Sequence, residues 1–535
     1  MATVKRILQP QIAEDGSVSY FSLKSPPDDS IAVCYMVPDR TIPVIFVPGI
    51  MGSNLCSKEN KPVWVVDSSK AMLPWVPRNA AFRKATLDPA KTRIFDGGKL
   101  PTGTSLPAAE LRRRGWGTVS RKSYGDWLVW LQNALDDCYP GTDYGRKGLR
   151  ASLMDTVIAP GLEKLTEAEV GRSYRYRLPV HAVGYNWLQS NEDASRHLGN
   201  EIDRIIKEYR YKGRCERVII VTHSMGGLVA RHCSEVRGYR DKIFGIVHGV
   251  MPATGSATAY KRVKSGTESD GSLVGLLASL VLGATAEEVT AVFAQAPGAL
   301  QLLPGPDYGN GWLKIRDGEL PVLSLPQRGD PYEEIYTQRH VWWGLIDQRI
   351  INPLDEGKKS VDQDWMRFAK LIKEEVDPFH DEISRRYHPH TYAFYGDDPQ
   401  RKTWGDVVWL CRRSPTLWKD AGSLLDDPRY GAMDKPIARD DRVGAIDVLA
   451  GRRDWIPIHK TFRIQPGSEN GDGTVPVRSG RAPEQFARAC VGFAGIDHER
   501  AYNPTPKPQS PQFFALWAIT RIIGNVKGTA MDYPL

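Results

Sequence analysis

A serine near the middle of the chain has the setting of a reactive nucleophile. Ser224 lies in the segment Val221-Thr-His-Ser-Met-Gly-Gly227, between the β-branched run 217–221 and the helical run 228–232. A tight strand–turn–helix connection exposes a serine hydroxyl and points it at free backbone N–H groups, provided that small residues follow it, as two glycines do here. The pattern predicts that Ser224 is a nucleophile for acyl transfer.

The motif departs from the usual G-x-S-x-G pattern at its first position, where Thr222 replaces glycine. A threonine fits there only if the helix leaves room for its methyl group. The alternative interpretation is an ordinary strand-to-helix turn in which Ser224 caps the helix. His223, directly before the serine, is interpreted as a packing residue.

Residues that could complete a catalytic triad follow far downstream, in the order serine, acid, histidine. Asp472 lies in the turn Gly471-Asp-Gly-Thr-Val-Pro476, whose glycines free the backbone to present a carboxylate. The pair Asp397-Asp398 is the rival acid, since it also follows a predicted strand. His498 is the one histidine after Asp472, and we predict that it is the general base.

A glycine-rich loop early in the chain could stabilise the negative charge that develops on a carbonyl under attack. The segment 48–55, Pro-Gly-Ile-Met-Gly-Ser-Asn-Leu, follows an apolar strand pattern. In hydrolases with a serine at a strand–turn–helix connection, one backbone donor comes from such a loop and another from the residue after the nucleophile. The expected donors are Ile50, or else Met51, and Met225; the alternative is a plain β-turn.

The elements that must position these residues form an alternating pattern. Short, nearly continuous apolar runs bounded by turn residues are typical of buried parallel strands. A clear amphipathic helix is expected from about Asn191 to Arg210. Strands alternating with helices predict an α/β fold with a mostly parallel central sheet flanked by helices. The predicted strands are 43–47, 179–183, 217–221, 243–247, 391–395 and 489–494.

The strand pattern is interrupted after residue 254, which suggests an inserted region. We expect an N-terminal extension (1–40), the first part of the core (41–254), a helical cap or lid (255–385) with little β character, and the second part of the core (386–535). The last part contains an insertion at about 398–466. Within the cap, the apolar stretch Leu273–Phe293 is expected to act as a lid; the alternative is a plain pair of buried helices.

Charge and cysteine content narrow the class of protein. The net charge is +8, from 71 basic and 63 acidic residues, and the charges are dispersed. No P-loop, dinucleotide-binding fingerprint or nucleic-acid module occurs, so no nucleic-acid partner is expected. The seven cysteines are widely spaced and form no CxxC pair, which argues against a disulfide framework or zinc ribbon and favours folding in a reducing cytosol.

Two segments, at the N-terminus and in the middle of the chain, bear on localisation. Residues 1–9 carry basic side chains but no apolar region or cleavage site, so no secretory signal is expected. The longest apolar stretch, 272–286, is shorter than the roughly 20 residues that span a bilayer. The expectation is a soluble protein, cytoplasmic in the cell that makes it and exported without a signal peptide.

A group of histidines offers a second kind of chemistry. His380, Asp381, His388 and His390 fall close together and could hold a metal. His388 and His390 would point the same way only on a strand, and strand-entry and loop positions are the favoured interpretation. No metal and no cofactor are expected.

Together these motifs resemble the lecithin:cholesterol acyltransferase-like branch of the α/β-hydrolases. The matching segments occur in the family's order over about residues 45–500. One departure is Asn186 and Leu188, where the family usually has aspartate and arginine; it concerns a local ion pair and not the triad. The matching segments are Val47–Gly49, Gly184–Trp187, Thr222–Gly227, Pro297–Pro304, Gly471–Val475 and His498.

Within that branch, the inserted region, the absence of a signal peptide and the segment Tyr387–Gly396 are similar to bacterial type VI secretion lipase effectors. The resemblance implies an antibacterial toxin that cleaves phospholipids at the membrane of a rival cell, from the periplasm. It also implies a cognate immunity protein and contact with a component of the secretion apparatus. The alternatives are a lipid acyltransferase or soluble esterase of the same fold, and a catalytically dead binding protein.

Overall fold

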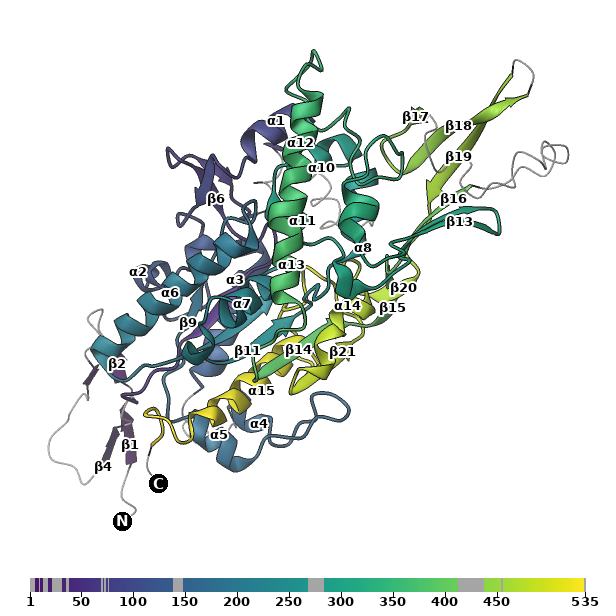
Figure 1. Ribbon diagram of the computed structural model, residues 1–535. Coiled ribbons are helices and arrows are strands. Elements are labelled where there is room, and N and C mark those ends of the chain that lie inside the picture. The colour runs from purple at the N-terminus through teal and green to yellow at the C-terminus, as the bar shows by residue number, and fades with distance from the viewer. Residues whose placement is uncertain are drawn as a thin grey trace.

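The computed structural model describes residues 5–8, 10–12, 18–21, 31–34, 38–68, 71, 74–75, 77–137, 148–267, 283–411, 437–453 and 456–533. At its centre is a six-stranded sheet in the order β21-β14-β11-β10-β5-β9, and every neighbouring pair is parallel (Figure 1). Each strand overlaps one predicted from the sequence, so the expected α/β fold is confirmed. The strands are β5 (Val44–Val47), β9 (Val180–Ala182), β10 (Val218–His223), β11 (Ile243–Gly249), β14 (Thr391–Gly396) and β21 (Ala489–Phe493).

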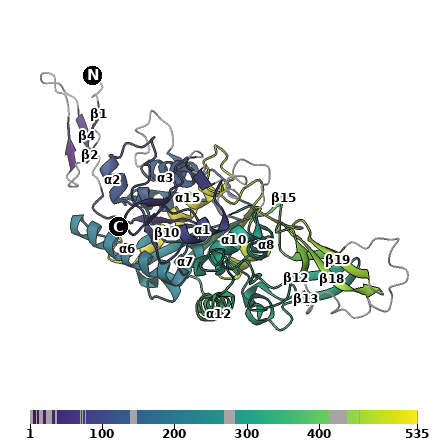
Figure 2. The same ribbon diagram turned by 90° about the horizontal axis from the view of Figure 1, so that it is seen from above.

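Helices cover both faces of this sheet (Figures 1 and 2). Because strand side chains alternate, Val44 and Phe46 of β5 join one hydrophobic core and Ile45 and Val47 join the other. The first core is completed by α3 (Arg121–Leu135) and α15 (Pro511–Ile522), and the second by α6 (Asn191–Lys212) and α7 (Gly226–Glu235). Burial on both faces explains why the strands are almost uninterrupted apolar runs.

A second six-stranded sheet extends away from the central one (Figures 1 and 2). Its order is β13-β12-β16-β19-β18-β17, so it joins strands of the expected cap to strands of the later insertion. The expectation of little β character in 255–385 is therefore wrong for residues 313–325. The strands are β12 (Leu313–Asp317), β13 (Leu320–Leu325), β16 (Val407–Cys411), β17 (Ile437–Asp440), β18 (Ala445–Arg453) and β19 (Ile456–Ile464).

Helices make up much of the rest of the cap. Of the expected lid Leu273–Phe293, residues 273–282 lie outside the described residues. The described end forms α10 (Ala286–Phe293), whose Val289, Val292 and Phe293 are buried and which packs against α1 (Ala80–Thr86) and α8 (Ala257–Ser265). The other cap helices are α11 (Pro297–Leu300), a π-helix η5 (Tyr332–Tyr336), α12 (Val361–Leu371), a π-helix η6 (Ile372–Val376) and α13 (Asp377–Ile383).

Within the described ranges, no helix is both long and apolar enough to cross a bilayer.

Smaller elements complete the structure. Small sheets are formed by β1 (Lys5–Leu8) with β4 (Ile31–Cys34), β2 (Pro10–Ile12) with β3 (Val18–Tyr20), β6 (Leu55–Ser57) with β7 (Pro62–Trp64) and β8 (Thr92–Ile94), and β15 (Asp398–Thr403) with β20 (Glu469–Gly471). The short helices are α2 (Ala108–Arg113), α4 (Leu149–Ser152), α5 (Glu167–Ser173), α14 (Val477–Gly480), η2 (Trp116–Thr118), η3 (Arg240–Lys242), η4 (Pro306–Tyr308), η8 (Ala482–Gln485) and η9 (Ile523–Val526).

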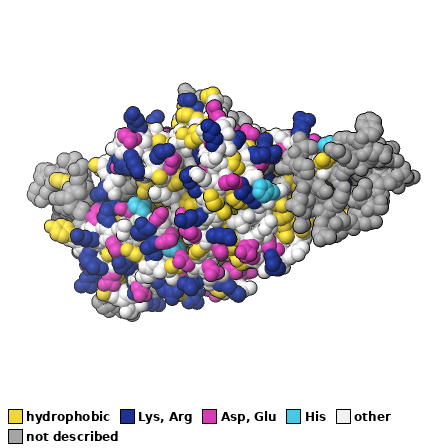
Figure 3. Space-filling view, turned by 45° about the horizontal axis from the view of Figure 1, so that its top comes forward, with side chains coloured by type: hydrophobic (Ala, Val, Ile, Leu, Met, Phe, Trp, Pro, Cys, Tyr) yellow, Lys and Arg dark blue, Asp and Glu magenta, His cyan; other side chains and the backbone are white. Residues whose placement is uncertain are grey.

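Basic and acidic side chains are mixed on the surface shown in Figure 3. This matches the dispersed charge expected from the sequence, and the face presents no large field of one sign that would attract a polyanion.

Candidate active site

Ser224 lies at the turn between β10 and α7, with its backbone in the left-handed region at a φ of +52°. Its N–H donates to the carbonyl of Gly249 over 2.9 Å. Glycines make room for the turn: a Cβ on Gly226 would lie 2.4 Å from the Pro48 oxygen, and one on Gly49 would lie 2.9 Å from the Ser224 Cβ. The segment has the strained strand–turn–helix geometry that the sequence predicts, and it brings the loop after β5 against the serine.

Thr222, the unusual residue of the motif, has a polar partner on β11. Its side chain is buried, and its hydroxyl lies 3.0 Å from Nδ1 of His248 on the neighbouring strand. Its carbonyl accepts a hydrogen bond from the Tyr502 hydroxyl over 3.0 Å. A glycine could not make the contact with His248, so threonine is stabilised at this position by a specific polar partner.

The structure brings the predicted nucleophile, base and acid together in one hydrogen-bonded row. His498 Nε2 lies 2.9 Å from Ser224 Oγ, and His498 Nδ1 lies 2.8 Å from Asp472 Oδ2. The His498 N–H also donates to the Asp472 carbonyl over 3.1 Å. Since the carboxylate can only accept, Nδ1 carries the imidazole proton and Nε2 is left to accept the serine proton.

Asp472 is built to remain ionised. It is buried, and its second oxygen, Oδ1, accepts hydrogen bonds from the N–H groups of Thr474 (2.9 Å) and Val475 (2.7 Å). Burial alone would raise the pKa of Asp472. The charge of His498 and the hydrogen bonds from His498, Val475 and Thr474 outweigh burial and lower that pKa below its ordinary value.

The rival acids have other partners. Asp397 accepts from the side-chain amide of Asn470, and Asp398 accepts from the N–H groups of Gly495 and Gln400. The residue before them contributes by its smallness, because a Cβ on Gly396 would lie 2.6 Å from the Asp472 Cβ. Asp472, and not the rival pair, is therefore the carboxylate that reaches His498.

The loop that follows β5 is tied down at several points. Gly49 N–H donates to the Tyr124 hydroxyl over 3.1 Å, the Tyr185 hydroxyl donates to the Pro48 carbonyl over 2.9 Å, and Trp64 Nε1 donates to the Met51 carbonyl over 2.8 Å. Met51 itself has a φ of +64°. Nothing in the sequence around Tyr124 marks it as part of this site.

The expected oxyanion donors, Ile50 and Met225, directly follow the two residues, Gly49 and Ser224, at which the loop and the serine meet. Among the described residues, the N–H groups of Ile50 and Met225 have no hydrogen-bond acceptor. Ile50 follows Gly49, whose Cβ position faces the serine, and Met225 follows Ser224 directly. Two unpaired amides beside a serine are the arrangement that a developing oxyanion requires.

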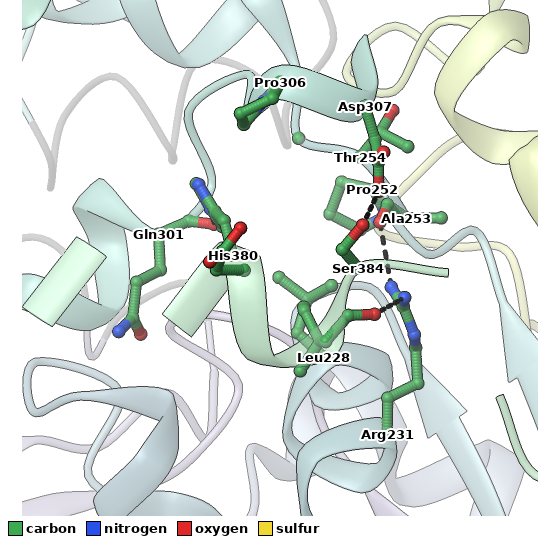
Figure 4. A pocket seen from close by; sticks show the side chains of 14 residues that line it. Leu228, Arg231, Pro252, Ala253, Thr254, Gln301, Pro306, Asp307, His380 and Ser384 are labelled. Carbon is green, nitrogen blue, oxygen red and sulfur yellow. Dashed lines mark hydrogen bonds between the residues drawn. The ribbon is translucent and has the colours of Figure 1, made fainter. Parts of the chain in front are cut away.

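A pocket beside α7 is separate from the triad (Figure 4). None of Ser224, Asp472 or His498 lines it, and several of its polar side chains bond to the protein itself. Arg231 donates to the carbonyls of Ala253 and Ile383, and the Ser384 hydroxyl donates to Asp307. The contact with Ile383 ties α7 to the cap.

The histidine group weighed as a metal site is used for structure. Both ring nitrogens of His380 are engaged, Nδ1 with the Tyr332 hydroxyl at 2.7 Å and Nε2 with the Gln301 carbonyl at 2.8 Å. His388 Nδ1 accepts from the N–H of His390. In the part of the chain that the structure describes, no three His, Cys, Asp or Glu side chains are grouped to hold a metal ion.

A second row of serine, histidine and carboxylate lies outside the site. Ser195 Oγ of α6 is 2.7 Å from Nδ1 of His232 on α7, and His232 Nε2 is 2.9 Å from Glu382 Oε2 on α13. Ser195 is fully buried, and its hydroxyl also contacts the Glu192 carbonyl at 2.7 Å and Arg237 Nε at 3.1 Å. No motif in the sequence marks this set, which links three helices.

Comparisons with known proteins agree with the hydrolase-like geometry of the site. The family model for lecithin:cholesterol acyltransferase matches residues 159–312. The chain is similar to a chain of the crystal structure of the Tle4–Tli4 complex, with 30% identity, 92% of this chain and 99% of that chain covered, and a TM-score of 0.74. Phospholipase PlaB from Legionella pneumophila, at 12% identity, 85% and 93% coverage and a TM-score of 0.19, is too dissimilar to carry an argument. The comparison with curated proteins gives no match.

The likeness to Tle4 extends over nearly the whole of both chains, and the acyltransferase match covers the segment that contains Ser224. The predicted resemblance, the α/β-hydrolase fold and the class of lipid-hydrolysing esterase are thereby confirmed. The chain belongs to the Tle4 family of type VI secretion lipase effectors, within the lecithin:cholesterol acyltransferase-like α/β-hydrolases.

Proposed function

We propose that the protein hydrolyses acyl esters of glycerophospholipids through a covalent acyl-enzyme on Ser224. One observation carries the proposal: the Ser224 hydroxyl is hydrogen-bonded to His498, which is hydrogen-bonded to the buried Asp472, beside two unpaired backbone amides. Each group has the partner that its role in acyl transfer requires.

In the first half-reaction, His498 Nε2 takes the proton of the serine hydroxyl while Ser224 Oγ attacks the ester carbonyl carbon. The N–H groups of Ile50 and Met225 hold the oxyanion of the tetrahedral intermediate. The ester C–O bond then breaks, and His498 returns the proton to the leaving oxygen of the lysophospholipid. Asp472 keeps the imidazole in the required tautomer and stabilises its positive charge.

In the second half-reaction, a water molecule attacks the acyl-enzyme and gives its proton to His498. The bond between the acyl carbon and Ser224 Oγ breaks, the serine regains its proton, and a fatty acid leaves.

The proposed setting is an attack on the membrane of a rival bacterium. Membership of the Tle4 family supports export through a type VI secretion system, with contact to one of its components, and action on phospholipids from the periplasm. Tle4 is known in complex with Tli4, which supports a cognate immunity protein as the partner of this chain. Expression directed to the periplasm should stop growth, and the immunity protein should restore it.

A second candidate is transfer of the acyl group to an alcohol. The match of residues 159–312 to an acyltransferase family favours it. The two reactions share the acyl-enzyme and differ in the acceptor of the second step. A competing alcohol would divert acyl groups into new esters if transfer dominates, and would leave free fatty acid as the main product if hydrolysis dominates.

The test uses mass spectrometry of vesicles made of phosphatidylethanolamine and phosphatidylglycerol. The wild-type protein is expected to release fatty acid and lysophospholipid in equal amounts, Ser224→Ala to release neither, and Ser195→Ala to match the wild type. Release of products by folded Ser224→Ala would contradict the proposal, as would intact lipids after incubation with the wild type.

A further inference from the structure

His223, which the sequence suggests is a packing residue, makes two hydrogen bonds that join opposite sides of the site. Its Nε2 lies 2.7 Å from the carbonyl oxygen of His498, and its Nδ1 lies 2.9 Å from the Tyr124 hydroxyl. Tyr124 in turn accepts a hydrogen bond from Gly49 N–H over 3.1 Å. One continuous row of hydrogen bonds therefore runs from the loop before Ile50 to the backbone of the residue predicted as base.

The direction of each hydrogen bond in this row is fixed by its end groups. A carbonyl can only accept, so Nε2 of His223 must carry the proton and Nδ1 must accept. The Tyr124 hydroxyl therefore donates to His223, and its oxygen is free to accept from Gly49. No other tautomer of His223 satisfies both partners.

The surroundings keep this arrangement in one protonation state. His223 and Tyr124 are both buried, with 4% and 3% of their surface exposed. Burial, with the nearby charge of His498, lowers the pKa of His223 to about 3. His223 is therefore neutral under the conditions in which an esterase works, with the single ring proton that the row requires.

Neighbouring contacts show that the row spans the reacting centre. A Cβ on Gly49 would lie 2.8 Å from His223 Nδ1 and 2.9 Å from the Ser224 Cβ, so the loop, His223 and the serine are in contact. The Tyr124 ring packs against Phe46 on β5, with 4.9 Å between ring centroids. Tyr124 is thus anchored to the sheet.

We propose that His223 and Tyr124 are positioning residues that fix the separation between the oxyanion loop and the loop carrying His498. The inference rests on the proposed function, since it assigns a role relative to Ser224, Ile50 and His498. The row acts on the transition state through the backbone of Gly49 and of His498, and neither side chain touches the substrate.

The test separates the two hydrogen bonds of His223. Tyr124→Phe removes only the hydroxyl. His223→Gln places a donor near the position of Nε2 and loses the acceptor for Tyr124, whereas His223→Asn keeps an acceptor near Nδ1 and loses the donor to His498. The assay is hydrolysis of a soluble p-nitrophenyl ester, with kcat and KM measured separately.

Each variant is expected to lower kcat by about tenfold or more with KM changed less than threefold, because misplaced groups weaken transition-state binding in particular. Tyr124→Phe combined with His223→Gln should cost no more than His223→Gln alone, since that variant has already broken the link. Additive losses, or kcat within twofold of wild type in any folded variant, would overturn the inference.

A second buried histidine–tyrosine pair provides a matched control. His181 Nε2 on β9 lies 3.0 Å from the Tyr209 hydroxyl on α6, and neither element carries a residue of the predicted triad. Tyr209→Phe and His181→Gln should leave kcat unchanged, and an equal loss there would show a general effect of disturbing the core. If Tyr124→Phe fails to fold, His223→Gln and His223→Asn decide the question.

The failure of this inference can be told from failure of the proposed function. If Ser224→Ala abolishes ester hydrolysis while the His223 and Tyr124 variants remain fully active, only the positioning role is wrong. If Ser224→Ala retains activity, the proposed function itself is wrong.

Discussion

The molecule contains two rows of serine, histidine and carboxylate, and the hydrogen-bond distances within the two rows are nearly equal. In the first, Ser224 is 2.9 Å and Asp472 is 2.8 Å from His498. In the second, Ser195 is 2.7 Å and Glu382 is 2.9 Å from His232. Residue types and distances therefore do not distinguish the proposed nucleophile Ser224 from Ser195.

The difference lies in the backbone and in the other hydrogen bonds of each serine. Ser195 is inside helix α6, where its hydroxyl contacts the Glu192 carbonyl and the guanidinium of Arg237. Ser224 is at a strained turn, at a φ of +52°, and its hydroxyl contacts only His498 among the described residues. A serine whose proton is held by a carbonyl and whose lone pair is held by arginine has little left with which to attack.

The histidines are also used in opposite senses. His498 presents Nε2 to its serine and Nδ1 to a fully buried carboxylate, whereas His232 presents Nδ1 to its serine and Nε2 to Glu382, whose side chain is 46% exposed. Ser195 has 0% exposure, so an ester substrate has no access to its hydroxyl. The comparison favours Ser224 as the proposed nucleophile because of its access and its neighbouring backbone amides, more than because of the triplet itself.

The largest expected effect is the loss of the base. His498→Gln should lower kcat on the order of 10⁶-fold, as for other serine hydrolases that lose a triad histidine. His232→Gln removes the matching residue of the second row and should leave kcat within about threefold, although it costs stability because a buried hydrogen bond is lost. Steady-state hydrolysis of a soluble ester checks both, and a large loss in His232→Gln would erase the distinction between the rows.

Loss of the acid should have the next largest effect. Asp472→Asn places an amide opposite Nδ1 and favours the wrong tautomer of His498, which should lower kcat by about 10⁴-fold. Glu382→Gln, the corresponding change in the second row, should leave kcat unchanged. The measurement is kcat with melting temperature as a control for folding, and an active Asp472→Asn would transfer the role of the acid to another carboxylate.

A smaller effect is expected from crowding the acid. In Gly396→Ala the new Cβ would lie 2.6 Å from the Asp472 Cβ and 3.1 Å from its Cα, so the acid must shift. A displacement of about 1 Å in a catalytic group should lower kcat by about 10²-fold. Gly171→Ala in α5 meets no atom within 4 Å and should only raise stability, by about 1 kcal/mol, as measured by chemical denaturation. Equal activity of the two variants would show that Asp472 tolerates displacement.

The smallest effect concerns pH, where the two regions should behave alike. Burial lowers the pKa of His223, to about 3, and also that of His232. Because each takes up a proton more readily when unfolded, stability is lost as pH falls below about 6.5, by up to about 1.4 kcal/mol per pH unit for each histidine. His223→Gln and His232→Gln should each flatten the dependence of unfolding free energy on pH, whereas only His223→Gln should lower kcat. An unchanged slope in His223→Gln would contradict the buried neutral state.

Local patterns in the sequence were enough to locate the central sheet and the residues of the first row. β-branched runs bounded by turns mark β5, β10 and β11, because strands buried on both faces must be continuously apolar. Glycines after Ser224 and on both sides of Asp472 mark the two turns, because a close backbone approach requires small residues.

Features that depend on contacts between residues distant in sequence could not be predicted from local patterns. The second sheet pairs β12 with β16, more than 80 residues later, and the buried residues of β12 alternate with Lys314 and Arg316, so no continuous apolar run marks that strand. Tyr124 owes its place to a hydrogen bond with His223, 99 positions away. Ser195 lies in a helix whose pattern is that of any amphipathic helix, so the second row could not be seen before the helices were packed together.

The most direct test of the account is the site of reaction with an alkyl fluorophosphonate, which forms a covalent bond with an activated serine. After reaction of the wild-type protein, peptide mass spectrometry should find the adduct on Ser224 and none on Ser195, and Ser224→Ala should remain unmodified while folded. An adduct on Ser195, or modification of Ser224→Ala at an equal rate, would contradict the claim that the first row and not the second is the active site.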